Sequence, residues 1–304
     1  MDRKAQLTIV LPVLGLLFAA TLWGVFWFPL RWLSSFGISG VLATFIIYCG
    51  TLVFILPSLF TRYRDWFAQP GLLIGLVLSG GWTNTAFILA LVEGEVVRVI
   101  LLFYLSPIWA TILARLILKE RITRYAYVNL MIACVGALIM LWTPELGYPW
   151  PSSSADWLAL SSGLAFAFSN LLTHMAVKCS YRTKTSAIWL GGVLIAGVAL
   201  LFQQQPFANV DSMGILYGAL IGIFMMSAMT YAVVFGITHM PVHRSAVILL
   251  FEIVAAAVSA YLLTDERMSV YEWVGGGVVI LSAYLAARQQ SSIENENKQH
   301  VTSH

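Results

Sequence analysis

Charged residues are scarce in this chain of 304 residues, since Asp, Glu, Lys and Arg together make up 10% of it, against roughly 25% in an ordinary soluble domain. Hydrophobic residues make up 60%, and the mean hydropathy is +0.84. A soluble protein of this size needs far more charge on its surface, so the composition excludes a soluble enzyme and a soluble nucleic-acid binder. The net charge of +3 is too small to indicate a polyanionic partner, and no nucleic acid is expected.

The motifs of several function classes are missing as well. The three cysteines form no CxxC pair and no metal-spaced set, so we expect packed thiols and no metal site. No GxxxxGK[ST] loop is present, so the chain is not expected to hydrolyse ATP. A membrane-embedded enzyme would need a nucleophile–base pair, an HExxH helix or paired acids inside the membrane, which the sequence does not supply. We therefore expect neither an enzyme nor a cofactor.

Long apolar runs occupy most of the chain instead. A transmembrane helix needs about 20 mostly apolar residues, and ten stretches meet this requirement. The connections between them are too short for a soluble domain, so the sequence predicts an all-α polytopic membrane protein with a polar cytoplasmic tail at 289–304. The expected spans are residues 8–30, 38–60, 71–92, 97–118, 125–143, 156–177, 185–203, 213–237, 244–264 and 271–288.

The basic residues predict the orientation of these spans. Ten spans place both termini on one side of the membrane. If that side is cytoplasmic, 14 of the 17 Lys and Arg residues fall in inner segments, and only Arg31, Arg98 and Arg267 fall in outer ones. The positive-inside rule then predicts an integral plasma (inner) membrane protein with both termini in the cytoplasm.

The two halves of the sequence correspond when one is shifted by 146 residues. Each half holds five expected spans, and because five is odd, the second half enters the membrane from the opposite side. The sequence thus predicts two inverted-topology repeats, residues 1–146 and 147–288, with a substrate site near the membrane midplane between them. The charged and aromatic matches at this offset are Arg98 with Arg244, Glu120 with Glu266, Arg121 with Arg267, and Tyr125 with Tyr271.

Four short motifs stand out in the two halves of the sequence, namely LWGVFWFPLR at 22–31, LSP at 105–107, KERIT at 119–123 and DERMS at 265–269. They resemble motifs of the EamA family of the drug/metabolite transporter (DMT) superfamily. The EP motif of that family is half present, since Ile253 follows Glu252, so we expect a straighter helix there than a proline would give. The resemblance covers about residues 8–288 and implies ten helices, two inverted five-helix repeats, and export or exchange of small metabolites, often amino acids.

Glu252 is the most informative single residue, because it is the only acid in the interior of any expected span. It lies eight residues after Arg244 and fourteen before Glu266, about 12 Å and 21 Å along a helix, and therefore deep in the bilayer. A buried carboxylate is costly unless it is protonated, paired or hydrated. We therefore expect Glu252 to face a substrate cavity, as a ligand for a substrate amine or as a proton carrier. The alternative is a neutral Glu that only links two helices.

Repeat symmetry and polar residues extend the expected binding site. Ser106 corresponds to Glu252 at the 146-residue offset, and Phe103 and Trp109 lie three residues to either side of it. Packing against lipid or core is the alternative for these two aromatic residues. Polar side chains in a membrane either link helices or line a cavity, and an interfacial position is the alternative for the histidine. The expected lining adds Asn84, Tyr231, Trp23, Asn170 and His174.

Charged residues at the starts of the fourth and ninth spans are candidate gates. Arg98 follows Glu93 and Glu95, and Arg244 begins the ninth span at the opposite face. Each arginine is placed to form a latch that opens in one access state. Snorkelling of the long side chain toward water is the alternative.

Together these features predict a secondary transporter, an exporter of small metabolites such as amino acids or related compounds, that works by alternating access around a site between the repeats. An exchanger or importer of a larger solute is the second interpretation, and a channel-like facilitator is the third. The expected partners are a small-molecule substrate and the lipid bilayer. Coupling to a proton or to a counter-substrate stays open, as does the choice between a monomer and a homodimer.

Overall fold

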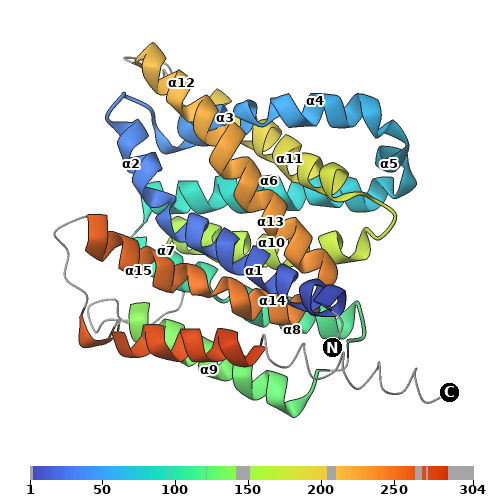
Figure 1. Cartoon of the computed structure of the whole chain (residues 1–304). Helices are drawn as coiled ribbons and strands as arrows, with labels where there is room; N and C mark the ends of the chain where they lie inside the picture. The colour runs from blue at the N-terminus through green and yellow to red at the C-terminus, as the bar shows by residue number, and fades with distance from the viewer. Residues whose placement is uncertain are drawn as a thin grey trace.

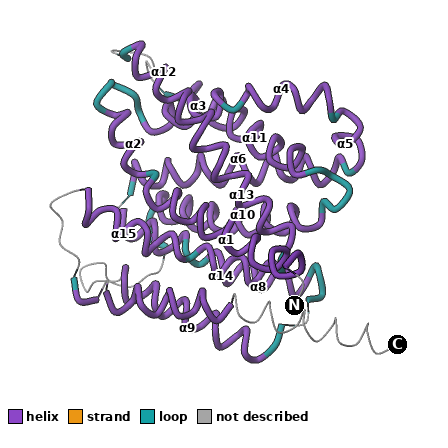
Figure 2. The backbone as a smooth tube through the Cα atoms, in the orientation of Figure 1, coloured by secondary structure: helices purple, strands orange, loops and turns teal. Residues whose placement is uncertain are grey.

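The computed structural model is built from helices alone in the part of the chain that it describes. These residues are 3–94, 96–120, 122–141, 151–203, 210–263, 269–271 and 273–286, and every regular element within them is helical (Figure 1, Figure 2). Eight of the helical segments are long and apolar enough to cross a membrane. The predicted all-α membrane architecture is therefore confirmed, whereas the expected tail at 289–304 lies outside the described residues.

The helices follow one another with short connections. In the first half of the chain they are α1 (Arg3–Val25), α2 (Trp27–Ser34), α3 (Gly40–Gly50), α4 (Leu52–Thr61), α5 (Tyr63–Ala68), α6 (Pro70–Glu93), α7 (Val96–Phe103), α8 (Ser106–Leu116) and α9 (Arg124–Leu141). In the second half they are α10 (Ser154–Met175), α11 (Tyr181–Leu201), α12 (Ser212–Ile221), the π-helix η2 (Gly222–Met226), α13 (Ser227–His239), α14 (Val242–Leu249), α15 (Phe251–Leu263) and a last helix, Trp273–Ala286.

The expected count of ten spans is not confirmed by the described residues. The span expected at 38–60 consists of α3 and α4, which bend by 42° at their junction. Thr51 lies at this junction and its hydroxyl donates to the Tyr48 carbonyl at 2.6 Å, a bond that competes with the helical ladder and bends helices. The span expected at 271–288 is described as the apolar helix Trp273–Ala286, and residues 272, 287 and 288 lie outside the described residues.

Two spans are interrupted at positions related by the repeat. Tyr104 and Leu105 separate α7 from α8, and Leu250, which is 146 residues after Tyr104, separates α14 from α15. A proline lies in the first turn of α8, where its missing N–H is tolerated. The second interruption has no proline and is confined to Leu250, and Val242–Leu263 is still long and apolar enough to be one candidate span. The Leu250 N–H bonds instead to the Val247 carbonyl at 3.2 Å.

Helices of the two halves interleave, which places the candidate site between them. α6 packs against both α10 and α11, and α1 packs against α13 and α15 (Figure 1). Gly191 permits the close approach of α11 to α6, because a Cβ there would collide with the Val77 carbonyl. Small residues likewise let neighbouring helices in a membrane approach closely elsewhere in the fold. On α12 and η2 these are Gly214, Gly218 and Gly222, whose added Cβ atoms would meet Phe36, Ile46 and Ile47 respectively.

Candidate functional site

A cavity of about 460 Å³ lies between helices of both halves of the chain. It extends to the end of the bundle where α2, α9 and α15 finish, since Arg31, Leu141 and Ala260 line it there. Glu252 is the one acidic residue among its described lining residues, and most of the others are apolar. Such a cavity suits a solute with an apolar body and few polar groups. Its aromatic lining residues are Trp23, Phe26, Trp27, Tyr48, Phe87 and Tyr104.

Glu252 and Tyr104 lie at the two interrupted spans and face each other. Glu252 occupies the first turn of α15, where the free N–H groups of a helix start favour negative charge. The hydroxyl of Tyr104, between α7 and α8, is the hydrogen-bonding partner of the Glu252 carboxyl. Both residues line the large cavity. A solute in the cavity therefore meets one carboxyl group, held in place by a hydroxyl and a helix start.

The LWG motif brings α1 against the backbone beside Glu252. A Cβ on Gly24 would lie 2.6 Å from the Glu252 carbonyl oxygen, so a larger residue would push α1 and α15 apart. The neighbouring Trp23 lines the cavity, and the Trp27 indole donates to the Ser259 hydroxyl at 2.8 Å. The motif thus fixes the position of α1 and α2 relative to the carboxyl group.

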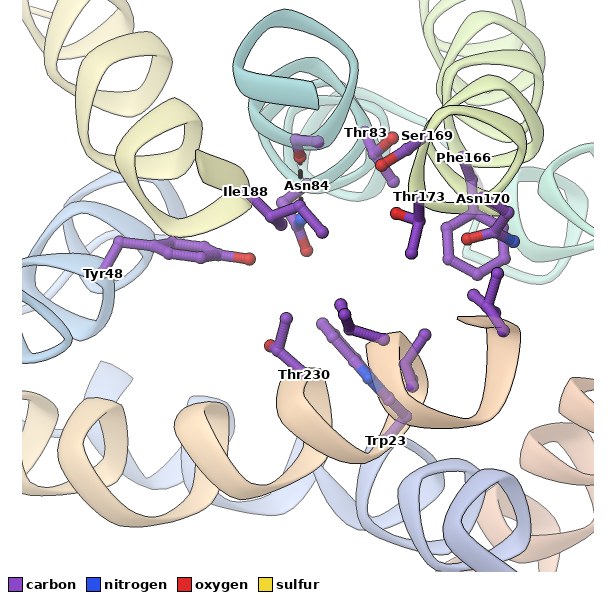
Figure 3. Close-up of a pocket in the computed structure, with 14 residues that line it drawn as sticks. Trp23, Tyr48, Thr83, Asn84, Phe166, Ser169, Asn170, Thr173, Ile188 and Thr230 are labelled. Carbon is purple, nitrogen blue, oxygen red and sulfur yellow. Dashed lines mark hydrogen bonds between the residues drawn. The ribbon is translucent and has the colours of Figure 1, made fainter. Parts of the chain in front are cut away.

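A second cavity, of about 50 Å³, adjoins the first (Figure 3). Trp23, Tyr48 and Asn84 line both cavities. Figure 3 shows the Tyr48 hydroxyl and the Asn84 amide pointing into the same space. Seven of the 14 described residues that line the small cavity carry a side-chain hydroxyl or amide, Tyr48 and Asn84 among them. Its remaining polar lining residues are Thr83, Ser169, Asn170, Thr173 and Thr230.

The two lining asparagines leave hydrogen-bonding groups for a ligand. The Asn84 side-chain amide nitrogen donates to the Gly80 carbonyl at 3.0 Å, which leaves its carbonyl oxygen toward the small cavity (Figure 3). The Asn170 side chain is 4% exposed, and its amide nitrogen has no hydrogen-bond partner. Buried polar groups are nearly always bonded, so this donor indicates a place for a bound molecule or water.

Three residues expected on the fourth span lie outside both cavities. Phe103 packs against Phe87 and Phe166, with ring centroids 4.8 Å and 5.6 Å away. Ser106 is buried within α8, and Trp109 packs against a small apolar cluster around Ala110 and Ala246. Ser106 is the counterpart of Glu252 at the 146-residue offset, but the residue that contacts Glu252 is Tyr104. The correspondence between the two halves is therefore only approximate at this position.

Two further expected residues also lie outside the cavities. Tyr231 is 40% exposed and its ring lies 6.4 Å from that of Tyr181. Its neighbour Thr230 lines the small cavity instead, since successive residues of a helix point about 100° apart. The His174 Nδ1 bonds to the Ile237 carbonyl at 3.1 Å, which links α10 to α13. Of the expected lining residues, the structure brings together Glu252, Trp23, Asn84 and Asn170.

Comparison with known proteins shows what kind of protein contains this site. The EamA-like transporter family matches residues 10–142 and 153–288, which together span nearly the whole chain. The chain belongs to the EamA-like transporter family, part of the drug/metabolite transporter superfamily. It is 24% identical over 219 residues to an uncharacterized transporter of Archaeoglobus fulgidus, covering 71% of this chain and 76% of that protein.

A solved crystal structure shares the fold. It superimposes with a TM-score of 0.73 at 15% identity, over 92% of this chain and 98% of that one. At this identity the likeness concerns the fold alone. The family and the apolar helices together identify an integral membrane protein of a transporter family.

The gate candidates of this EamA-like transporter differ in their surroundings. Glu93 is exposed, and its carboxylate accepts from the Ser154 hydroxyl at 3.5 Å. Glu95 and the side chain of Arg98 lie outside the described residues. Arg244 is only 7% exposed, so it does not snorkel into water, and the charge of Glu120 acts on it.

A contact between the two halves lies beside Arg244. The Nδ1 atom of His243 and the Oε2 atom of Glu120 are 2.8 Å apart, which joins the segment after α8 to the start of α14. This contact lies at the end of the bundle opposite the mouth of the large cavity, since α8 finishes and α14 begins there. In the described conformation the large cavity thus extends toward one end of the bundle, and the His243–Glu120 contact joins the two halves at the other.

The Glu120–His243 contact changes the acidity of the carboxyl group. Burial by itself would raise the pKa of Glu120, but the hydrogen bond to His243 and the charge of that ring outweigh burial and hold the pKa below its usual value of 4.5. A carboxyl group with a lowered pKa in the folded state stabilises the fold at pH values above about 4.5. That stabilisation is lost as the pH falls through the folded-state value.

We expect Glu120→Gln to lower the free energy of unfolding by about 1 kcal/mol at pH 7, because one hydrogen bond between the halves loses its charge. The difference in melting temperature between wild type and variant should shrink below pH about 4.5, where wild-type Glu120 also takes up a proton. Thermal unfolding of the purified proteins over a range of pH measures this difference. A difference in melting temperature that stays the same at all pH values would show that the contact contributes no charge-dependent stability.

Several lining residues were not expected from the sequence. Tyr104 directly precedes the LSP motif, but a tyrosine in an apolar span is ordinarily read as core or lipid-facing. The sequence around Tyr48 likewise does not indicate a cavity. Nor does it for Thr83, Ser169 and Thr230, because threonine and serine in spans commonly bond to their own helix. Their position beside a cavity depends on how five or more helices cross, which local patterns do not specify.

Proposed function

We propose that this EamA-like transporter is a secondary transporter that exports small metabolites, amino acids or related compounds, by alternating access around the two adjoining cavities. The observation that carries the proposal is Glu252, a single carboxyl group at the meeting point of two interrupted spans and the wall of a 460 Å³ cavity. Interrupted helices at the midplane between repeats are where secondary transporters bind their substrates.

The shape of the cavity system supports alternating access. The large cavity reaches one end of the bundle, and the Glu120–His243 contact bridges the halves at the other. A channel-like facilitator would need a path through both ends, so a transporter is favoured. We also propose Arg244 as part of this gate, and Arg98 with Glu93 and Glu95, at the start of the fourth expected span, as the gate on the opposite face. Coupling to a proton or to a counter-substrate fits a carboxyl group in the binding site.

Reconstitution in proteoliposomes tests the proposal. Vesicles preloaded with a mixture of unlabelled amino acids should take up a labelled amino acid faster than empty vesicles, and the rate should saturate with concentration. A flux that rises linearly and shows no counterflow would favour a facilitator. An exchanger or importer of a larger solute would show no counterflow with amino acids but would do so with larger metabolites.

We expect both chain termini on the cytoplasmic side of the plasma (inner) membrane. In a variant with serine in place of its three cysteines, a cysteine at Asp211 should react with an impermeant maleimide added to intact cells. Cysteines at Arg64 and Arg182 should react only after the cells are opened. All three positions are exposed on the protein surface, so accessibility reports the side of the membrane. Labelling of the cysteine at position 64 in intact cells would contradict the proposed topology.

A further inference from the structure

A surface patch at one end of the bundle combines exposed basic and aromatic side chains. α5 connects the end of α4 to the start of α6, and residues 176–180 connect α10 to α11 at the same end (Figure 1). Connections between membrane spans lie at the membrane surface, where the lipid headgroups are. Residues 60–69 and 177–182 together are called the α5 patch below, because α5 lies at its centre.

Hydrogen bonds hold the two segments of the α5 patch together. The Gln69 side-chain carbonyl accepts from the Lys178 backbone N–H at 2.9 Å. The Asp65 carboxylate accepts from the Ser180 backbone N–H and from the Thr183 hydroxyl, each at 3.3 Å. A segment from the first half of the chain and a segment from the second half therefore form one continuous surface.

The short helix α5 turns an aromatic face outward. Trp66 packs against the apolar cluster that contains Leu73 and Leu172, which fixes α5 on the bundle. Tyr63 and Phe67 are four residues apart and so lie on one face of the helix; they are 53% and 78% exposed. Exposed aromatic rings at the end of a span are typical of the membrane interface, where they contact both headgroups and acyl chains.

The α5 patch carries an excess of positive charge. Asp65 is its one acidic residue, and because the Asp65 carboxylate bonds at the start of α11, the free N–H groups of that helix start offset its charge. Four cations against one carboxylate leave an excess of three positive charges. The four basic residues, all exposed, are Arg62, Arg64, Lys178 and Arg182.

These cations are not neutralised within the described chain. The Arg64 Nε atom donates to the Tyr63 hydroxyl at 3.0 Å, and the guanidinium carbon lies 5.7 Å from the centre of that ring, so its partner is a neutral phenol. The side chains of Arg62, Lys178 and Arg182 form no ion pair or hydrogen bond with another described residue. A group with negative charge and several acceptor oxygens would satisfy them.

We propose that the α5 patch binds an anionic phospholipid of the surrounding membrane, with its phosphate held by the four basic side chains and its acyl chains lying against the aromatic face of α5. Guanidinium groups match the oxygens of a phosphate in pairs, and basic residues at a membrane surface attract anionic lipids. Because the patch includes segments of both halves, the bound lipid bridges them. The inference goes beyond the proposed function, since it holds whichever solute is carried.

Thermal unfolding of the purified full-length protein in detergent measures this binding. Two lipids with identical acyl chains are compared: phosphatidylglycerol, which is anionic, and phosphatidylcholine, which is zwitterionic. We expect phosphatidylglycerol to raise the melting temperature at about tenfold lower concentration, because only its headgroup has a net negative charge. Glycerol 3-phosphate, which supplies a phosphate without acyl chains, should have no effect at the concentration where phosphatidylglycerol saturates.

Removing two of the charges should remove most of this preference. The double variant Arg62→Gln/Arg182→Gln takes one cation from each segment of the patch. It should raise the concentration of phosphatidylglycerol needed for half of the stabilisation about thirtyfold, with the response to phosphatidylcholine unchanged. Arg62→Lys/Arg182→Lys keeps both charges and should retain most of the preference. Native mass spectrometry should show fewer phosphatidylglycerol molecules on the glutamine variant than on wild type.

Lys119→Gln/Arg124→Gln is the matched control. It also removes two exposed cations, from the segment between the end of α8 and the start of α9 at the same end of the bundle (Figure 1). Both residues lie outside the α5 patch. The control should respond to both lipids as wild type does. Because all four substituted side chains are exposed, we expect each variant to melt close to wild type when no lipid is added.

The other outcomes overturn the proposal. Equal stabilisation of wild type by the two lipids would show that the patch does not select an anionic headgroup. Equal losses in the patch variant and the control would show that overall charge, and not the patch, attracts the lipid. Stabilisation by glycerol 3-phosphate as strong as that by phosphatidylglycerol would assign the patch to a soluble phosphate. Each of these results leaves the transport proposal intact, because counterflow in proteoliposomes tests that proposal separately.

Discussion

Glu252→Gln is expected to reduce the initial rate of transport about tenfold to a hundredfold, with normal expression and a melting temperature close to wild type. The amide keeps the shape of the side chain and can still bond to the Tyr104 hydroxyl. It removes the charge that would meet a substrate amine and the proton that the carboxyl group could carry. Loss of a hydrogen bond to a charged group is worth about 1.5–3 kcal/mol, which corresponds to that range of rates.

The kind of flux that survives in Glu252→Gln identifies the role of the carboxyl group. If Glu252 carries a coupled proton, flux driven by a pH gradient should fall while exchange at equal pH survives. If Glu252 binds the amine, both kinds of flux should fall. Substrate should then also no longer raise the melting temperature of the protein. Wild-type rates in both assays, with unchanged pH dependence, would show that the carboxyl group is structural.

A companion variant tests the hydroxyl that holds Glu252. Tyr104→Phe should reduce transport by a smaller factor, because the charge remains and only its positioning is lost. Tyr127→Phe on α9 is the matched control, since Tyr127 is 44% exposed and lies outside both cavities. The control should transport at the wild-type rate. An equal loss in both variants would indicate a general effect of removing a tyrosine hydroxyl.

Gly191→Ala is expected to destabilise the protein by about 1–3 kcal/mol or more, as over-packing of a tight interface does. The new methyl group would collide with the Val77 carbonyl on α6, and a backbone atom cannot rotate away as a side chain can. α6 would have to move away from α11. Because α6 also carries Asn84, which lines both cavities, transport should fall together with stability.

Gly71→Ala on α6 is the control for this substitution. A Cβ on Gly71 would have no atom within 4 Å, so the alanine should be neutral or stabilising by up to about 1 kcal/mol through its better helix propensity. Melting temperatures and transport rates of both variants measure the contrast. A Gly191→Ala protein as stable and active as Gly71→Ala would show that α6 and α11 do not pack this closely.

The sequence and the structure each contribute different residues to the candidate site. Glu252 was identified from the sequence, because an acid inside an apolar span is costly wherever it points. Trp23, Asn84 and Asn170 were also expected and do line the cavities. Ser106 was expected by strict repeat symmetry, whereas Tyr104 meets Glu252 in the structure. Symmetry of sequence positions does not transfer to side-chain directions when a helix is interrupted between them.

The amino-acid sequence by itself determined the membrane environment, the helical class, the family and the position of most spans. These follow from composition and from the length of apolar runs, which act locally and do not depend on neighbours. Only the tertiary structure decided that α3 and α4 bend at their junction, that Lys184 is buried, and that Tyr104 meets Glu252. Each of these depends on which helices cross and how closely, and glycines such as Gly24 and Gly191 set that distance. Lipid tails are as apolar as the helix surfaces, so the hydrophobic pattern of a span does not show which face packs against another helix. The shape of the site therefore depends on the assembled fold.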